Sequence, residues 1–412
     1  MSVISRSLAI VLIILLAVLP VQASEDDDAG NPLATLPLRP IGPAITSGRI
    51  SDFAFYPGGD HEFLAGISSG NLFRTTNGGI TWEAIFENEG SYAIGVVELD
   101  PNDTNTIWVG TGENNAQRSV AAGDGVYKST DGGKSWTNTG LQDSGHISQI
   151  WINPDDSDEV LVASQGPLWS DGGDRGLYRT LDGGDSWERI LEVDEHTGIN
   201  EFVVDPRNPD VIVASSYQRR RHVWVLINGG PGSGIHKSTD RGKTWTEITA
   251  GLPSDHMGRI GLAGAPSDPD MIYAIIEAND EEKGVYRSTD FGSNWEKRSS
   301  YMTTSPQYYN EIVVDPKNSE RLYALNTFTM KSEDGGTTFA PLSNKWRHVD
   351  DHALWIDPHN TRHLYIGGDG GIYETWDRGT TWRHVRNLSI TQFYRVQPDY
   401  VEPFYNVCGG TQ

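Results

Sequence analysis

Short stretches in which apolar and polar residues alternate follow one another along almost the whole chain. Residues 199–204 and 211–214 are two such stretches, separated by a turn that contains Asp205 and Pro206, and the same arrangement recurs around Pro316. Alternation with a period of two is typical of half-buried β-strands, and Asp-Pro pairs favour turns. No segment shows amphipathic helical periodicity of useful length. The pattern therefore predicts an all-β protein.

An eight-residue sequence, Ser/Thr-x-Asp-x-Gly-x-Thr/Ser-Trp, recurs along the chain. Residues 75–82 and 129–136 are two copies, and seven copies end at positions 82, 136, 187, 245, 295, 339 and 382, which places them 43 to 58 residues apart. A strand-like run such as residues 125–128 precedes each copy, so each copy is expected to be the turn of a β-hairpin. Four-stranded units that repeat every roughly 40 to 55 residues are typical of β-propeller blades.

We call this repeat the Asp box. Its residue types indicate that it has a structural role. The Asp carboxylate can accept hydrogen bonds from backbone N–H groups of the turn, and the glycines can adopt positive φ without steric cost. The final Trp offers a large apolar surface that can pack between neighbouring sheets. The residues expected in these structural roles are Asp131, Asp182, Asp240, Asp290, Asp334, Asp377, Trp82, Trp136, Trp187, Trp245, Trp295 and Trp382.

The repeats define the expected domain organisation. Residues 44–390 are predicted to form an Asp-box β-propeller of seven four-stranded blades, preceded by a linker over residues 24–43. Residues 391–412 contain two further strand-like stretches, near 392–396 and 404–408, without a following Asp box. They either close the ring against the first blade or begin a further blade of a larger or double propeller. The second alternative is favoured.

Residues 1–23 are typical of a secretory signal peptide. Arg6 precedes an unbroken apolar stretch over residues 8–19, and a small-residue cleavage site ends at Ala23. The apolar stretch is shorter than the about 20 residues that are needed to span a bilayer. We therefore expect a secreted or periplasmic chain with no membrane span after removal of the leader.

Composition narrows the classes of partner. The chain contains 56 Asp and Glu residues against 32 Lys and Arg residues, which gives a formal net charge of −24. Such a chain repels nucleic acid, because phosphate binding needs clustered cationic side chains. The single cysteine cannot form an intrachain disulfide, so the fold depends on its core. Extracellular proteins, peptides and polysaccharides are the expected partners, and neither a cofactor nor a metal is predicted.

A binding site is expected on the face opposite the Asp boxes. The innermost strand of each blade would start on this face, and polar residues recur beside an apolar position of those strands, so they would converge on the mouth of a central channel. Ordinary lining of a water-filled channel explains the same pattern equally well. The fourth blade adds a loop with a basic cluster and an aromatic residue that could stack on a sugar, although a solvated loop with local ion pairs is the simpler interpretation. The candidate ligand-binding residues are Arg49, His146, Asn200, Arg259, Asn310, His352 and Trp224.

Carboxylates near the same face are the candidates for catalysis. Glycoside hydrolysis needs two carboxyl groups about 5 to 10 Å apart across a cleft. His and Asp residues alternate in direction along the strand near residue 350, so a metal there would need ligands from other blades, and structural hydrogen bonding is favoured. The candidate catalytic residues are Glu113, Asp350, Asp351 and Asp369, with Glu277 as a further carboxylate.

The Asp boxes resemble the bacterial neuraminidase repeat (BNR), which occurs in sialidases, sortilin-type receptors and several glycosidases. Residues 41–50, 109–114, 123–133 and 352–358 are most similar to large secreted bacterial proteins described as sortilin N-terminal-domain-like or as glycosyl hydrolases. In xyloglucan-cleaving members the first-blade catalytic Asp stands just before a Gly-Gly and an aromatic strand. This sequence has Ser68 at the corresponding place, and that departure argues against glycosidase activity.

Three functions are compatible with these observations. The leading hypothesis is a secreted propeller that binds an extracellular peptide or glycan on the face opposite the Asp boxes. The alternatives are a glycoside hydrolase related to xyloglucan-cleaving enzymes and a structural propeller of a larger surface protein.

Overall fold

The computed structural model describes residues 47–398, 400 and 407–411, and all regular structure in these residues is β. The all-β prediction is therefore confirmed. The predicted signal peptide and linker lie outside the described residues, as does most of the strand-like stretch at 404–408. The described residues contain no helix of the length and apolarity that a membrane crossing requires.

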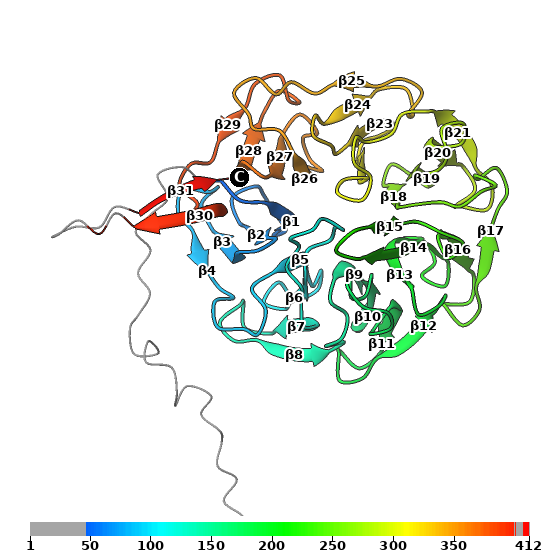
Figure 1. Ribbon diagram of the computed structural model, residues 1–412, viewed down its shortest axis with the longest axis horizontal. Helices are drawn as coiled ribbons and strands as arrows, with labels where there is room; N and C mark the ends of the chain where they lie inside the picture. Colours follow the sequence, from blue (N-terminus) through cyan, green and yellow to red (C-terminus); the bar gives the residue numbers. More distant parts are fainter. Residues whose placement is uncertain (1–46, 399, 401–406, 412) are drawn as a thin grey trace, which may run out of the picture. The chain divides into compact units, whose positions relative to one another are not determined.

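Seven antiparallel sheets follow one another along the described chain, each built from consecutive strands (Figure 1). The first comprises β1 (Ile50–Phe55), β2 (Phe63–Ile67), β3 (Asn71–Thr75) and β4 (Glu83–Ala84). The second comprises β5 (Ile94–Leu99), β6 (Ile107–Thr111), β7 (Val126–Ser129) and β8 (Thr137–Gly140). The third comprises β9 (Ile147–Asn153), β10 (Asp156–Ser164), β11 (Gly176–Thr180) and β12 (Glu188–Leu191).

The fourth sheet has an additional strand. It comprises β13 (Thr197–Val204), β14 (Ile212–Arg221), β15 (Leu226–Asn228), β16 (Gly234–Ser238) and β17 (Thr246–Ile248). The fifth comprises β18 (Ile260–Ala265), β19 (Asp268–Ile276), β20 (Gly284–Ser288) and β21 (Glu296–Ser299). The sixth comprises β22 (Ile312–Asp315), β23 (Asn318–Ala324), β24 (Met330–Ser332) and β25 (Ala340–Pro341). The seventh comprises β26 (Asp351–Ile356), β27 (Leu364–Gly368), β28 (Gly371–Thr375) and β29 (Arg383–His384).

The sheets are arranged as the blades of a ring, with the first strand of each sheet innermost (Figure 1). The seventh sheet meets the first, because β26 and β27 pack against β1 and the Gly48 N–H donates to the Asp369 carbonyl at 2.8 Å. Each sheet consists of consecutive strands, so the first and seventh sheets share no strand. Beyond the ring, β30 (Phe393–Pro398) pairs with β31 (Val407–Thr411) in a separate two-stranded sheet.

The hydrophobic core lies between adjacent sheets. One buried cluster joins Val96 and Trp108 of the second sheet to Ile150 and Val160 of the third, and each neighbouring pair of sheets has a similar cluster. Strand residues that point to the two faces of a sheet are therefore both buried, which explains nearly continuous apolar runs such as β2.

Each Asp box closes the turn between the third and fourth strands of its sheet. The Asp131 carboxylate accepts hydrogen bonds from the backbone N–H groups of Lys134 and Ser135, both at 2.9 Å, and from the Ser135 hydroxyl at 2.7 Å. The Ser129 hydroxyl donates to the same carboxylate and accepts from the Gly133 N–H, each at 2.9 Å. The same arrangement occurs around Asp182, Asp240, Asp290, Asp334 and Asp377.

The aromatic residue that ends each box lies between sheets. Four indole N–H groups donate to a backbone carbonyl of the preceding sheet, in the pairs Trp136–Ile85, Trp187–Thr139, Trp245–Ile190 and Trp382–Ser343. Trp82 packs into the cluster between the first and seventh sheets, and Trp295 packs into the cluster between the fourth and fifth sheets. The Phe339 ring stacks on Tyr301. The box thus links turn geometry to packing between sheets.

Strand direction defines two faces of the ring. Because paired strands are antiparallel, the Asp boxes and the turns between first and second strands lie at one end, which we call the box face. The turns between second and third strands, and the connections from one sheet to the next, lie at the opposite end, which we call the loop face. The predicted binding residues belong to the loop face or to the channel beneath it.

Candidate functional site

A loop of the second sheet occupies the mouth of the central channel on the loop face. Residues 113–116, which we call the plug, extend from the connection between β6 and β7. The Ala116 N–H donates to the Gln307 carbonyl of the opposite side of the ring at 2.9 Å, and the Asn115 carbonyl accepts from Arg219 Nη1 at 2.9 Å. The plug therefore connects the second sheet to the fourth and to the segment that leads into the sixth.

Arg49 is bound by one carboxylate of the plug and by one carboxylate that follows β27 in the seventh sheet. Its Nη1 lies 2.6 Å from Glu113 Oε1, and its Nε lies 2.9 Å from Asp369 Oδ1. The Tyr308 hydroxyl also donates to Asp369, at 3.0 Å, and the Arg49 guanidinium lies over the Tyr308 ring. Burial opposes ionisation of Asp369, but the neighbouring His352 and Arg49 hold its pKa below the usual value. The cationic group is thus already neutralised within the fold.

Arg259 and its neighbours form a second buried network. Asn200 Oδ1 accepts from Arg259 Nε at 3.2 Å, and Asn310 Nδ2 donates to the Arg259 carbonyl at 2.7 Å. Arg259 Nη2 also lies 3.3 Å from Glu311 Oε1. His146 Nδ1 lies 2.8 Å from the Glu113 carbonyl, and burial lowers the pKa of this imidazole well below its usual value. These side chains hold the plug and the inner strands together.

The structure therefore brings six of the seven predicted ligand-binding residues together, but as buried supports of the plug. The buried residues are Arg49, His146, Asn200, Arg259, Asn310 and His352. The seventh, Trp224, is 83% exposed. Sequence reasoning placed the polar positions beside the channel but missed that a loop of the same chain fills the channel mouth. Asn114 and Asn115, in a loop longer than a hairpin needs, were the available signal.

The predicted catalytic carboxylates are engaged in hydrogen bonds as well. Asp351 is buried, accepts from Thr329 Oγ1 at 2.6 Å and pairs with Arg347. Asp350 accepts a hydrogen bond from the Tyr309 hydroxyl. Through these contacts, the polar segment near residue 350 connects the sixth sheet to the seventh.

The remaining three carboxylates have different surroundings. Glu113 and Asp369 are 0% and 3% exposed and share the Arg49 guanidinium. Glu277 accepts from Asn228 Nδ2 at 2.8 Å, and burial raises its pKa. It lines a cavity of about 280 Å³ that contains none of the other four candidate carboxylates. A pair of carboxyl groups across an open cleft is therefore not formed by these residues.

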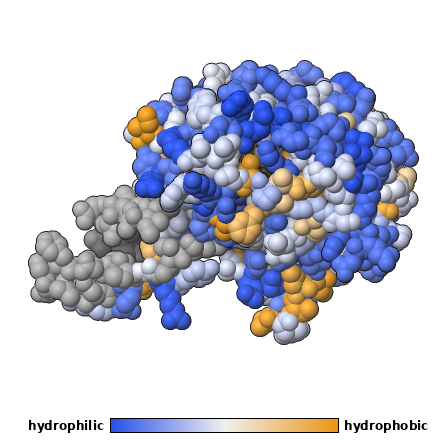
Figure 2. Space-filling view, turned by 90° about the horizontal axis from the view of Figure 1, so that it is seen from above, coloured by the Kyte–Doolittle hydropathy of each residue, from blue (hydrophilic) through white to orange (hydrophobic). Residues whose placement is uncertain are grey.

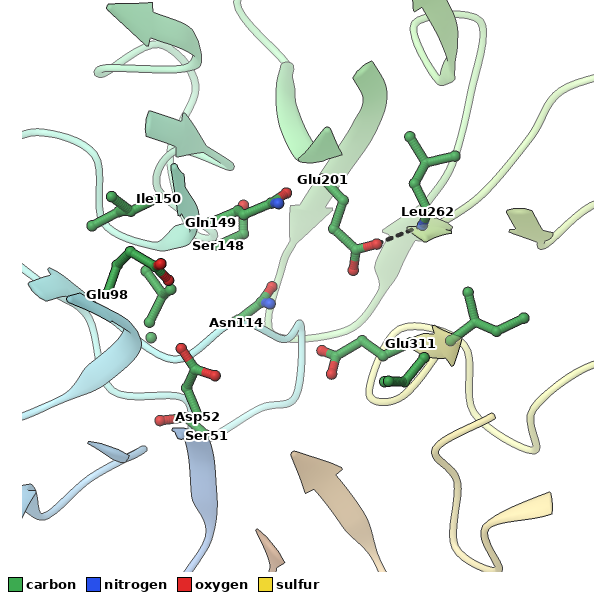
Figure 3. Close-up of a pocket in the computed structure, with 14 residues that line it drawn as sticks. Ser51, Asp52, Glu98, Asn114, Ser148, Gln149, Ile150, Glu201, Leu262 and Glu311 are labelled. Atoms are coloured by element: carbon green, nitrogen blue, oxygen red, sulfur yellow. Dashed lines mark hydrogen bonds between the residues drawn. The ribbon is translucent and has the colours of Figure 1, made fainter. Parts of the chain in front are cut away.

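A cavity of about 270 Å³ lies in the channel under the plug, and sequence reasoning missed its acidic lining. Asp52, Glu98, Glu201 and Glu311 direct their carboxylates toward this space, and Asn114 of the plug reaches into it (Figure 3). Burial raises the pKa of Asp52 to about 7 and that of both Glu98 and Glu201 to about 8.

Exposed aromatic side chains gather on the loop face. Six Phe, Tyr or Trp side chains of residues 47–390 are strongly exposed, and five of them lie in loop-face connections, the sixth being Trp376 in an Asp box. On the side shown in Figure 2 the surface is largely hydrophilic, with hydrophobic residues at a few separate places. The five loop-face residues, with their exposed fractions, are Tyr92 (61%), Trp169 (45%), Trp224 (83%), Phe328 (51%) and Trp346 (84%).

Two of these aromatic residues lie on loops that touch. Trp224 is at the tip of the β14–β15 hairpin, where its ring stacks on His222, and Trp169 lies in the connection between β10 and β11. The Arg221 N–H of the hairpin donates to the Leu168 carbonyl at 2.9 Å. The same two loops contribute Asp171 and His222 to a cavity of about 260 Å³, whose other lining residues are His196, Gln218, Arg219, Arg220 and Ile227. We call this cavity with its two Trp residues the hairpin site.

Fold and repeats define the chain as an Asp-box β-propeller, and comparisons with known proteins agree. The sequence model of the Sortilin-Vps10 family (sortilin, neurotensin receptor 3) matches residues 175–327. Xyloglucanase Xgh74A of Acetivibrio thermocellus is 28% identical over 244 residues, which cover 50% of this chain and 28% of the enzyme. A probable oligoxyloglucan-reducing end-specific xyloglucanase of Neosartorya fischeri is 25% identical over 284 residues, which cover 64% of this chain and 31% of that protein. The resemblance to BNR-type, sortilin-like propellers is thereby confirmed.

Solved structures support the same fold. The GH74 xyloglucanase from Xanthomonas campestris superposes with a TM-score of 0.62 at 17% identity, over 87% of this chain and 58% of that enzyme. YCF48 from Cyanidioschyzon merolae superposes with a TM-score of 0.53 at 16% identity, over 81% of this chain and 97% of that protein. The chain thus matches under a third of the length of each of the two curated xyloglucanases.

Proposed function

We propose that the chain is an extracellular glycan-binding propeller that holds a polysaccharide at the hairpin site of its loop face. The observation that carries this proposal is that the exposed Trp169 and Trp224 lie on two touching loops whose neighbouring residues, Asp171 and His222, line a cavity of about 260 Å³. Flat indole rings offer apolar area at low entropic cost, while the hydroxyl groups of a sugar need hydrogen-bond partners. The hairpin site supplies both.

The polar lining of the hairpin site suits a neutral or acidic sugar. Arg220 pairs with Asp171, and His196 Nδ1 lies 2.9 Å from the same carboxylate, so donors and acceptors are held in place around the cavity. Exposed loops on a rigid scaffold are common binding elements. The xyloglucanase relatives support a polysaccharide rather than a protein as the ligand, and the predicted signal peptide supports an extracellular location.

Binding to defined glycans tests the proposal. Titration calorimetry of the mature chain with xyloglucan oligosaccharides, cello-oligosaccharides and manno-oligosaccharides is expected to show binding to at least one of them. A stacked ring that contributes about 1.4 kcal/mol corresponds to a factor of ten in affinity, so Trp224→Ala and Trp169→Ala should each weaken binding about tenfold. Leu181→Ala is the matched control, because Leu181 is 60% exposed but belongs to an Asp box. No binding to any of these glycans, or equal affinity in the Trp169/Trp224 double variant, contradicts the proposal.

The xyloglucanase relatives favour glycoside hydrolysis as a second candidate function. Among the candidate catalytic carboxylates, Glu113 and Asp369 share the Arg49 guanidinium, and both are buried against it. This geometry predicts no release of reducing ends from xyloglucan by this chain. Release that disappears in Asp369→Asn would instead identify the chain as a hydrolase and would require the plug to move.

A further inference from the structure

A histidine and several carboxylates meet at the joint between the first and seventh sheets. His363, in the turn before β27, is 0% exposed, and its Nε2 lies 3.0 Å from Glu374 Oε1. This contact orients the ring so that Nδ1 faces the other way. Nδ1 has no hydrogen-bond partner among the described residues, although Asp60 Oδ2 and Asp357 Oδ2 lie 3.5 and 3.6 Å away.

These two separations are longer than a hydrogen bond but fit two ligands of one metal ion. Tetrahedral coordination with bonds of about 2.0 to 2.2 Å places ligand atoms about 3.4 Å apart. Carboxylate oxygens and a neutral imidazole nitrogen are a donor set for Zn²⁺ and related divalent ions. The unpartnered Nδ1 therefore points at a place that a cation of this kind would fill.

Glu374 lies close enough to Asp60 and His363 to be a possible ligand, but its other contacts suit an orienting role better. Besides His363 it accepts hydrogen bonds from the Tyr365 hydroxyl at 2.7 Å and from Arg383 Nε at 2.5 Å, so its charge is balanced and its position is fixed. Metal-binding histidines commonly donate their second ring N–H to such a carboxylate. That hydrogen bond would leave Nδ1 unprotonated and able to bind the ion.

The charge balance also points to a cation. Asp60 and Asp357 come from turns of two different sheets, and no Lys or Arg of the described residues pairs with either of them. His61 is 81% exposed on its side chain, with Nδ1 3.3 Å from Asp60 Oδ1, so it can rotate to become a fourth ligand. Two carboxylates facing an unpartnered imidazole nitrogen are otherwise an unbalanced arrangement.

We propose that Asp60, Asp357 and His363 bind a divalent transition-metal ion, with Zn²⁺ as the best fit, at the box face. The ion would join the first and seventh sheets, which pack against each other without sharing a strand. Its function would be to hold the ring closed, and it is separate from the hairpin site. Trp376 stacks on the His363 ring with centroids 3.6 Å apart and covers one side of the site.

Metal titration of the chelator-treated mature chain tests this proposal. Calorimetry should show one Zn²⁺ bound per chain and no binding of Mg²⁺ at the same concentrations. Asp60→Asn and Asp357→Asn should each weaken Zn²⁺ binding at least tenfold, whereas Asp155→Asn, in the exposed turn between β9 and β10, should leave it unchanged. Saturating Zn²⁺ should raise the Tm of the wild type by at least about 3 °C and that of Asp60→Asn by less.

A spectroscopic measurement locates the ion without depending on stability. Cu²⁺ bound to His363 should quench the fluorescence of Trp376, so the quenching measured for the wild type should be larger than for Trp376→Phe. Absence of stoichiometric binding, or equal Zn²⁺ affinity in the wild type and in Asp60→Asn, would overturn the proposal. His363 would then have only a structural role through its contact with Glu374, and the joint would show no response to metal.

Discussion

Truncation of one Asp-box indole measures how strongly neighbouring sheets are joined. Trp136 lies between the first and second sheets, where its Nε1–H donates to the Ile85 carbonyl at 2.7 Å and its ring meets Phe86 edge-on with centroids 5.0 Å apart. Trp136→Ala removes the hydrogen bond, the aromatic pair and the buried part of the ring together. The free energy of unfolding should therefore fall markedly.

The magnitude follows from these three contributions. A typical hydrogen bond contributes about 1 kcal/mol, an edge-to-face aromatic pair about 1 kcal/mol, and burial of a partly buried large side chain about 1.5 to 2 kcal/mol. We expect Trp136→Ala to lower the free energy of unfolding by about 3.5 to 4 kcal/mol, within the range for large-to-small core substitutions. Trp136→Phe retains most of the ring, so it should lose only about 1 to 1.5 kcal/mol.

Urea unfolding followed by circular dichroism provides the measurement. Trp346→Ala is the matched control, because the Trp346 side chain is 84% exposed and its removal should change stability by less than about 0.5 kcal/mol. The reasoning is refuted if Trp136→Ala loses less than about 1 kcal/mol, or no more than Trp346→Ala. Either result would mean that the indole does not contribute to packing between the sheets.

Three further predictions concern the box carboxylates, the channel and the plug. Hydrogen bonds from Ser135 lower the pKa of Asp131 from 3.8 to about 2. The stability that this carboxylate contributes should therefore persist above pH 4 and be lost as the pH falls toward 2. An unfolding midpoint that stays constant between pH 4 and pH 2 would contradict this prediction. Burial raises the pKa of Glu98 and Glu201 from 4.5 to about 8. These groups therefore ionise at lower pH in the unfolded chain than in the folded one, so the stability of the fold should decrease as the pH rises from about 5 to 8. The decrease in Tm over this range should be smaller for the Glu98→Gln/Glu201→Gln variant than for the wild type. Gly112, directly before the plug, has φ +91°, and an added Cβ would lie 2.0 Å from the Gly145 carbonyl oxygen. Gly112→Ala should therefore lower the free energy of unfolding, measured in urea, by at least about 2 kcal/mol. An unfolding midpoint equal to that of the wild type would show that the backbone at this position can relax.

The fold could be predicted from sequence because its determinants are local. A carboxylate such as Asp131 bonds to groups within four residues, so the turn, the hairpin and the period can all be found in the sequence. Alternation along strands then indicates which side chains face inward. These local rules repeat seven times, and their consistency distinguishes a propeller from unrelated strands.

The candidate site could be predicted only in part, because its determinants are distant in sequence. Arg49 meets Asp369, 320 residues away, and Arg221 reaches the Ala116 carbonyl from 105 residues away. No local pattern predicts that residues 113–116 would lie across the channel and bury the polar residues around it. The pairing of Asp60 with His363 is likewise a product of ring closure, which brings the two ends of the repeat array together.

The plug has a consequence for how the number of blades can vary. Its contacts to Arg219 and Gln307 span a fixed fraction of the circumference, so they can all form only in a ring of one diameter. Gain or loss of a repeat by gene duplication or deletion would widen or narrow the circle and leave this segment too short or too crowded to reach its partners. The contacts of this one loop therefore depend on the number of repeats in the ring.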